Sequence, residues 1–163
     1  MQSSLGYILR TRPYSDANVI VDLYTKEAGR ITCMARPAKL RGKVQKGHLQ
    51  PFRILQCHYQ GRGEMLRLNQ TDERFRHRIP VANLLYGLYL NELILRLIPQ
   101  NTSLDRLYSD YQSALQLLVD SEEPMLVVMR FEVALMEGLG HSLNLWNDDQ
   151  DGSEIEVGKR YLY

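Results

Sequence analysis

The first part of the chain, from Leu5 to about Gln70, alternates apolar and polar residues with a period close to two. β-branched and aromatic residues are frequent there, and short turn signals separate the runs, which is typical of β-strands. The pattern predicts five strands, at residues 6–12, 18–25, 30–36, 52–59 and 65–69. Five short strands with no helix among them indicate a small closed barrel of the OB or SH3-like kind, and periodicity alone does not choose between the two.

After Pro80 the spacing of apolar residues changes to that of α-helices. One stripe of a first helix, residues 81–98, consists of Leu84, Leu85, Leu88, Leu95 and Ile98. Because further apolar residues lie around the rest of this helix, we expect it at the centre of a bundle. The capping-box spacing of Thr102 and Asp105 predicts the start of a second helix. Pro124, after an acidic turn, predicts the start of a third, which runs to about Leu139.

The change of period predicts an α+β protein with two domains. Residues 1–78 form the small barrel, and residues 79–163 form an α-helical domain. The last residues, 159–163, read as the beginning of a strand, so we expect the helical domain to be incomplete.

The formal net charge of +1 conceals a strong asymmetry between these two parts. Residues 1–78 contain fifteen Lys/Arg and six Asp/Glu, a net charge of +9, whereas residues 79–163 contain five Lys/Arg and thirteen Asp/Glu, a net charge of −8. The sum, +9 − 8, is the overall +1. A basic barrel next to an acidic helical part favours a polyanion as the partner of the barrel.

The strongest concentration of charge lies between the third and fourth predicted strands. This segment has no acidic residue, and its cations are Arg36, Lys39, Arg41, Lys43 and Lys46. A flexible basic loop on a barrel can follow a phosphate backbone without reading bases, so we predict a DNA-binding role for it. The alternative is a solvated connection between strands. Arg10, Arg12 and Arg62 are weaker candidates, because strand arginines often only cover a small barrel.

Aromatic residues near this segment leave two interpretations open. Tyr14, Tyr24 and Tyr59 offer stacking faces for bases, but packing against the barrel is the more common role for a strand tyrosine.

Sequence signals for an enzyme, a cofactor or a metal are weak. We find no phosphate-binding loop, no dinucleotide fingerprint and no nucleophile elbow. The four histidines are scattered, which predicts no metal site. Cys33 and Cys57 lie at strand positions and are predicted to be small core residues. The absence of a signal peptide, of an apolar run long enough to span a membrane and of a disulfide framework favours a cytoplasmic protein.

Several segments resemble the RecO family of bacterial recombination mediators. In the barrel part they are RTRPYS at 10–15, VDLYTKEAGR at 21–30, LQPF at 49–52 and GRGE at 61–64. In the helical part they are LYLNEL at 88–93 and RFEVALMEGLG at 130–140. The resemblance covers nearly the whole chain in a consistent order.

The resemblance implies an N-terminal OB-fold followed by a helical domain, usually with several dozen more residues than this chain has. It implies a non-enzymatic, nucleoid-associated protein that binds single- and double-stranded DNA and anneals complementary strands. It also implies action with RecR in loading recombinase onto DNA covered by single-stranded DNA-binding protein. Some family members hold zinc with four cysteines, but this chain has no cysteine after Leu143.

Arg130 is the only cation of the third predicted helix and carries two interpretations. In the first, it forms an internal ion pair with Glu92 or Glu132, because a partly buried charge needs a partner. In the second, which rests on the resemblance, it binds the acidic C-terminal tail of single-stranded DNA-binding protein. Met129, Phe131 and Val133 are the candidates for an apolar groove beside it, and a place in the core is the equal alternative for each.

A different class of function stays open on composition alone. The chain also fits an RNA-binding OB or SH3-like module with a helical protein adaptor, because phosphate contacts are alike on RNA and DNA.

Overall fold

The computed structural model describes residues 1–37, 44, 46–141, 144, 147–148, 152–156 and 158–159, with the side chain of Lys46 outside this set. The elements, in chain order, are β1 (Gln2–Pro13), β2 (Val19–Thr25), β3 (Gly29–Ala35), the 3₁₀ helix η1 (Lys46–His48), β4 (Arg53–Gln60), β5 (Met65–Arg76), the 3₁₀ helix η2 (Val81–Asn83), α1 (Leu84–Leu97), α2 (Asp105–Asp120) and α3 (Pro124–Gly138).

The five strands close into a barrel in the order β1-β2-β3-β5-β4, with β4 returning to β1. Only the pairing of β3 with β5 is parallel among these neighbours. This is the five-stranded Greek-key arrangement of an OB-fold, which resolves the choice that periodicity left open. The predicted fold class is therefore confirmed.

Two of the strands are longer than the pattern predicts. β1 begins at Gln2 rather than Gly6, and β5 continues to Arg76 rather than ending at Asn69. The reason is pairing: β4 hydrogen-bonds to both strands over most of its length, so polar residues without apolar alternation are held in the sheet.

The barrel interior forms the first of two hydrophobic clusters. It contains Ile8, Val21, Leu23, Ile31, Leu55 and both cysteines. Cys33 and Cys57 are fully buried, as predicted, and this burial raises the pKa of each thiol to about 12. Neither thiol is therefore a nucleophile at neutral pH.

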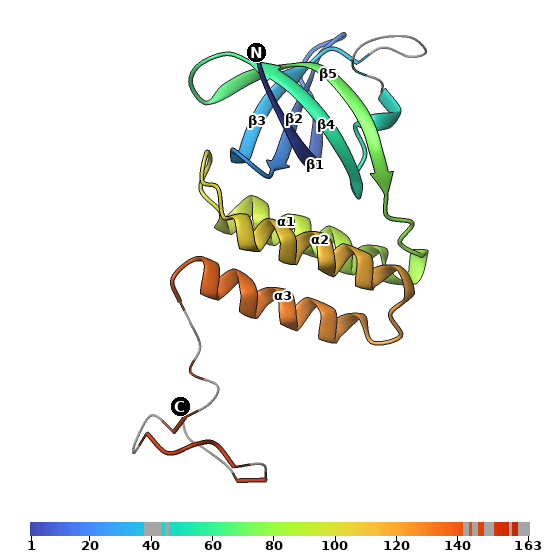
Figure 1. The fold of residues 1–163 in the computed structure, drawn as a ribbon. Coiled ribbons are helices and arrows are strands. Elements are labelled where there is room, and N and C mark those ends of the chain that lie inside the picture. The colour runs from blue at the N-terminus through green and yellow to red at the C-terminus, as the bar shows by residue number, and fades with distance from the viewer. Residues whose placement is uncertain are drawn as a thin grey trace.

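The second cluster joins the outside of the barrel to the helices. Tyr7, Leu9 and Tyr24 point outward from β1 and β2 and pack against residues of all three helices. The rings of Tyr7 and Tyr111 meet edge to face with centroids 5.1 Å apart. In Figure 1, α1 and α2 lie against the barrel and α3 packs on their far side. The barrel and the helices therefore share one core.

Polar contacts fix the position of the helices on the barrel. The Asn91 side chain donates a hydrogen bond to the Leu9 carbonyl (3.1 Å) and accepts one from the Tyr111 hydroxyl (2.5 Å). Gly29 has a φ of +67°, and a Cβ there would lie 1.8 Å from the carbonyl oxygen of Thr102. Only glycine allows the β2–β3 turn to approach the segment before α2 so closely.

Two helix predictions are corrected by this packing. The buried residues of α1 are Gly87, Leu90, Asn91 and Ile94, whereas Leu85 is 75% exposed and Leu88 is 41% exposed. α1 is therefore buried on one side only, which corrects the expectation that it lies at the centre of a bundle. α2 begins at Asp105 with Leu104 as its N-cap, so Thr102 and Asp105 do not form a capping box.

Candidate nucleic-acid interface

The outer face of β1, β2, β3 and β5 brings cations to both sides of a partly apolar strip. Strand register places Arg12, Ile20, Met34 and Arg67 in one row across the four strands. Arg12 and Arg67 are exposed, and Ile20 and Met34 are half-buried between them. This face and its flanking loops are where OB-folds bind oligonucleotides.

A buried carboxylate organises the β1 side of this face. Oδ2 of Asp22 lies 3.0 Å from Nε of Arg10 and 3.4 Å from Nη2 of Arg12, and Oδ1 accepts a hydrogen bond of 2.9 Å from the Thr32 hydroxyl. The Asp22 side chain is 3% exposed, whereas both arginine side chains are 48% exposed. The three residues together carry a net charge of +1, and each guanidinium keeps most of its N–H donors available.

The loops at one end of the barrel meet on this side. The register aligns Pro13, Val19 and Ala35, so the β1–β2 turn and the segment after β3 leave the barrel at the same end. Arg36 is exposed directly after β3, and Tyr14 is 59% exposed in the β1–β2 turn. Tyr24 and Tyr59 are buried, which confirms the packing interpretation for both.

Much of the predicted basic loop lies outside the described residues. This holds for Lys39, Arg41 and Lys43, and for the side chain of Lys46, whose backbone begins η1. The described parts of the connection are anchored, because Val44 and Leu49 are buried in the barrel cluster.

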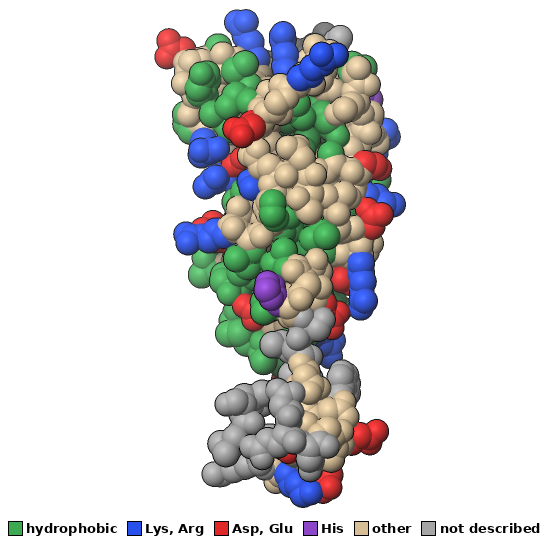
Figure 2. Space-filling view, turned by 90° about the vertical axis from the view of Figure 1, so that its left-hand side faces the viewer, with side chains coloured by type: hydrophobic (Ala, Val, Ile, Leu, Met, Phe, Trp, Pro, Cys, Tyr) green, Lys and Arg blue, Asp and Glu red, His purple; other side chains and the backbone are tan. Residues whose placement is uncertain are grey.

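Other cations lie around the barrel. Arg62 is exposed in the β4–β5 turn. Figure 2 shows Lys and Arg side chains projecting from the barrel end of the molecule. Sequence reasoning missed Arg67, although alternation with Leu66 and Leu68 would have placed it outside. It also missed the exposed arginines Arg74, Arg76 and Arg78, because β5 was predicted to end before them.

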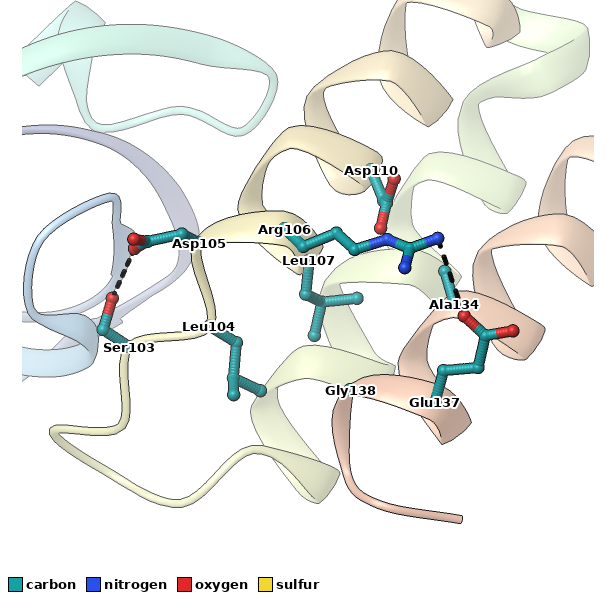
Figure 3. A pocket seen from close by; sticks show the side chains of 9 residues that line it. All are labelled: Ser103, Leu104, Asp105, Arg106, Leu107, Asp110, Ala134, Glu137 and Gly138. Carbon is teal, nitrogen blue, oxygen red and sulfur yellow. Dashed lines mark hydrogen bonds and ion pairs between the residues drawn. The ribbon is translucent and has the colours of Figure 1, made fainter. Parts of the chain in front are cut away.

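A hollow of about 440 Å³ between the start of α2 and the end of α3 has the wrong charge for DNA. Its lining includes Asp105, Asp110 and Glu137, and the Arg106 side chain runs between Asp110 and Glu137 (Figure 3). Arg106 Nη2 lies 3.7 Å from a Glu137 carboxylate oxygen. Three carboxylates against one paired cation repel a phosphate backbone.

Arg130 has a different environment from the one predicted. It is exposed and lines a hollow of about 140 Å³ between α2 and α3, beside Leu117 and Val127. Within the described part of the chain it forms no ion pair. The two proposed partners are engaged elsewhere: Glu92 pairs with Arg96 at 2.5 Å, and Glu132 accepts a hydrogen bond from Tyr89. The internal ion pair is therefore a wrong prediction.

Only one of the three groove residues predicted around Arg130 lines its hollow. Phe131 lines the hollow, but it is 2% exposed and belongs to the shared core, so it offers a bound peptide almost no surface. Met129 is 52% exposed but does not line the Arg130 hollow, and Val133 is half-buried. The other apolar residues that line the hollow are Ala114, Leu117, Val127 and Ala134.

Comparison with known proteins assigns the family. The model described as "Recombination protein O N terminal" matches residues 1–73, and "Recombination protein O C terminal" matches residues 81–158. Proteins named "DNA repair protein RecO" from Vibrio vulnificus (35% identity), Psychromonas ingrahamii (31%) and Proteus mirabilis (35%) match over 96–97% of this chain. The chain belongs to the RecO family. It spans about two thirds of these relatives, namely 65%, 68% and 65% of their lengths.

RecO membership confirms the resemblance seen in the sequence. Two of the remaining predictions concern absences. Among the described residues, no three His, Cys, Asp or Glu side chains come together as metal ligands. In the same part of the chain, no helix has both the length and the apolar character needed to cross a membrane.

Proposed function

We propose that this RecO-family chain binds single- and double-stranded DNA without strong sequence preference and acts in DNA repair and recombination. The observation that carries the proposal is the outer face of the OB barrel, where Arg10, Arg12 and Arg67 surround half-buried apolar side chains. Arginines on such a face neutralise phosphates, and the apolar strip accepts bases or sugars. The relatives named as DNA repair proteins support the proposed role in DNA repair.

The basic segment after β3 also contributes cations to the proposal. Arg36 leaves the barrel at the end where the β1–β2 turn also lies, and Lys39, Arg41, Lys43 and Lys46 follow it in the sequence. In the proposal these five cations bind phosphates, and Arg62 binds a further phosphate from the β4–β5 turn. Phosphate contacts position a nucleic acid but carry no sequence information.

The proposed role is non-enzymatic. The cysteines have raised pKa values inside the barrel, and burial also raises the pKa values of Tyr7, Tyr24, Tyr108 and Tyr111 in the shared core. Groups held in their neutral forms by burial serve packing rather than proton transfer. We propose that bound strands are brought together for annealing, and that recombinase is loaded, with RecR, onto DNA covered by single-stranded DNA-binding protein.

The dependence of DNA affinity on salt tests the DNA-binding proposal. If all five loop cations neutralise phosphates of single-stranded DNA, the slope of log K against log salt includes a contribution of about −3.5 from them. A variant with Arg36, Lys39, Arg41, Lys43 and Lys46 changed to alanine loses this contribution for every sequence tested. Unchanged affinity and slope in that variant contradict the role of the loop.

The matched control removes two cations from the helical part. In the Arg96→Ala, Arg106→Ala variant, both replaced side chains are exposed and paired with a carboxylate, so DNA affinity is expected to stay the same. Binding to RNA and DNA oligomers of equal length completes the experiment. A clear preference for RNA favours the alternative, an RNA-binding module with a helical adaptor.

We also propose that Arg130 binds the acidic tail of single-stranded DNA-binding protein. The support is an exposed guanidinium without an ion pair to any described residue, beside an apolar hollow that includes Leu117. Arg130→Ala is expected to weaken binding of a labelled tail peptide by about 2 kcal/mol or more, because a charged hydrogen bond is removed. Arg106→Ala is the control with unchanged peptide affinity. Equal peptide affinity of folded Arg130→Ala and wild-type protein rejects the assignment.

A further inference from the structure

Another hollow lies where the end of the barrel meets α2. Its volume is about 530 Å³, and its lining consists of Ile54, Phe75, His77, Gln112, Ser113, Gln116 and Leu117. The first three come from β4, β5 and the residues after β5, and the other four come from α2. Figure 1 shows β5 running down from the barrel toward the helical layer at this place. None of these lining residues carries a carboxylate.

A β-bulge turns an aromatic ring into this hollow. The β4–β5 register changes from Leu55 opposite Glu73 to Ile54 opposite Phe75, so Arg74 is the extra residue. The change places Phe75 on the same side as Ile54, which packs against the shared core. Bulges commonly redirect a side chain in this way next to functional sites.

The Phe75 ring has a fixed support and a free surface. The rings of Phe75 and His77 meet edge to face, with their centroids 5.0 Å apart. His77 is 4% exposed, and its Nε2 lies 3.1 Å from the Tyr7 hydroxyl in a hydrogen bond. Phe75 itself is 48% exposed. A large aromatic ring that is held from one side and open on the other is a stacking platform.

A neighbouring hollow, of about 420 Å³, adjoins this one and shares His77 with it. It is lined by Pro51, Phe52, Arg76, His77, Arg78, Ile79 and Leu84. Arg76 and Arg78 are exposed and have no ion pair with any described residue. Two such arginines, in a lining without a carboxylate, make this hollow suited to a phosphate group.

The two adjoining hollows that share His77 are called the seam below. We propose that the seam binds one unstacked nucleotide of single-stranded DNA, with its base on Phe75 and its phosphate at Arg76 and Arg78. The proposal rests on the DNA binding proposed above and adds a base-binding site outside the OB face. Hydrogen-bond donors and acceptors for the edge of the base come from α2, at Gln112, Ser113 and Gln116. A base paired in a duplex has no free face for Phe75, so the site favours single strands.

Oligonucleotides with and without bases separate stacking from charge. Phe75→Ala is expected to weaken binding of oligo-dT about tenfold and to leave binding of an abasic oligomer of equal length unchanged, because only stacking is removed. Affinity for duplex DNA is also expected to stay the same. Leu85→Ala, which removes an exposed apolar side chain from α1, is the matched control without effect. Phe75→Trp is expected to restore oligo-dT binding.

The two arginines are expected to behave differently from Phe75. Arg76→Gln with Arg78→Gln weakens binding of both oligo-dT and the abasic oligomer, and lowers the salt slope by about 0.7 for each phosphate that is no longer neutralised. An oligomer carrying 5-iodouracil is expected to crosslink to wild-type protein at the peptide containing Phe75, which tests the site even if the Phe75→Ala chain does not fold.

Two outcomes overturn the proposal and can be told apart. If wild-type protein binds oligo-dT while folded Phe75→Ala binds it equally well, or if the crosslink maps elsewhere, the seam is not a base site and the DNA-binding proposal stands. If wild-type protein binds no oligomer at all, both proposals fail.

Discussion

At the scale of single residues, burial separates side chains that look alike in the sequence. Cys33 and Cys57 were predicted as core residues, and both are buried. Met129 and Phe131 lie in the same apolar helix, but Met129 is exposed and Phe131 is in the core. Because α3 carries apolar residues all round, its sequence does not tell which stripe faces α2. Arg67 and Asp22 could be placed only once the strand register was known.

Gly29 provides the sharpest test at this scale. Gly29→Ala is expected to lower the free energy of unfolding by about 2 kcal/mol or more, because it combines a positive φ with a clash against the Thr102 carbonyl. Gly63→Ala is the matched control. Gly63 also has a positive φ, of +85°, but a Cβ there meets no atom within 4 Å. Urea denaturation measures both, and equal losses of stability contradict the clash.

His77 makes the stability of the protein depend on pH. Burial lowers the pKa of its imidazole, and the Gln116 side chain acts in the opposite direction. The unfolded chain, with a histidine pKa of about 6.5, therefore binds the proton more readily than the folded one. The contribution of His77 is complete above the unfolded pKa and is lost as the pH falls through 6.5 toward the folded pKa.

Urea denaturation between about pH 7.5 and pH 5.5 measures this effect. The free energy of unfolding is expected to fall over this interval in the wild type and to fall less in His77→Gln. His141→Gln, which replaces an exposed histidine, is expected to keep the wild-type dependence. The same dependence in His77→Gln and wild type would assign the pH effect to other groups.

At the scale of elements, the alternation and the change of period predicted five strands and three helices in the right order. The ends of these elements, and the sides that they bury, could not be predicted as well as their order. β5 was predicted seven residues too short, 69 against 76, because its second half is held by pairing with β4 rather than by apolar alternation. The base site proposed at Phe75 lies in this missed half, and no sequence period marks it.

α1 shows the same limit for a helix. Its leucines surround the axis, and the buried line through Gly87, Leu90, Asn91 and Ile94 includes a glycine and a polar residue. At position 87 a Cβ would lie 3.0 Å from the Phe52 ring, so the packing favours glycine. At position 91 the asparagine side chain donates a hydrogen bond to the Leu9 carbonyl. Neither reason can be found within the helix itself.

Alanine substitutions on the two sides of α1 check this assignment. Leu90→Ala is expected to cost about 2–5 kcal/mol of unfolding free energy, because it leaves a cavity at a fully buried position. Leu85→Ala, at a position that is 75% exposed, is expected to change it by less than about 0.5 kcal/mol. Chemical denaturation measures both variants, and the reverse order of effects would contradict this assignment of the buried side.

At the scale of the whole molecule, charge and packing divide the chain differently. The sequence shows a basic part and an acidic part, with net charges of +9 and −8 that follow from the residue counts. The tertiary structure joins them, because the outward residues Tyr7, Leu9 and Tyr24 of the barrel belong to the same cluster as Tyr111 and Phe131. The charge boundary therefore says nothing about independent stability.

The shared core leads us to expect that the barrel and the helices unfold together. Tyr111 is fully buried between them, meets Tyr7 and Phe131 edge to face, and donates its hydroxyl proton to Asn91. Tyr111→Ala removes these interactions from both sides, at a cost of roughly 3 kcal/mol or more. Amide hydrogen exchange then shows reduced protection in β2 and in α2 alike, although the substitution lies in α2. If β2 keeps its wild-type protection while α2 loses its own, the barrel is stable by itself, and the core between them is an interface of two independent domains.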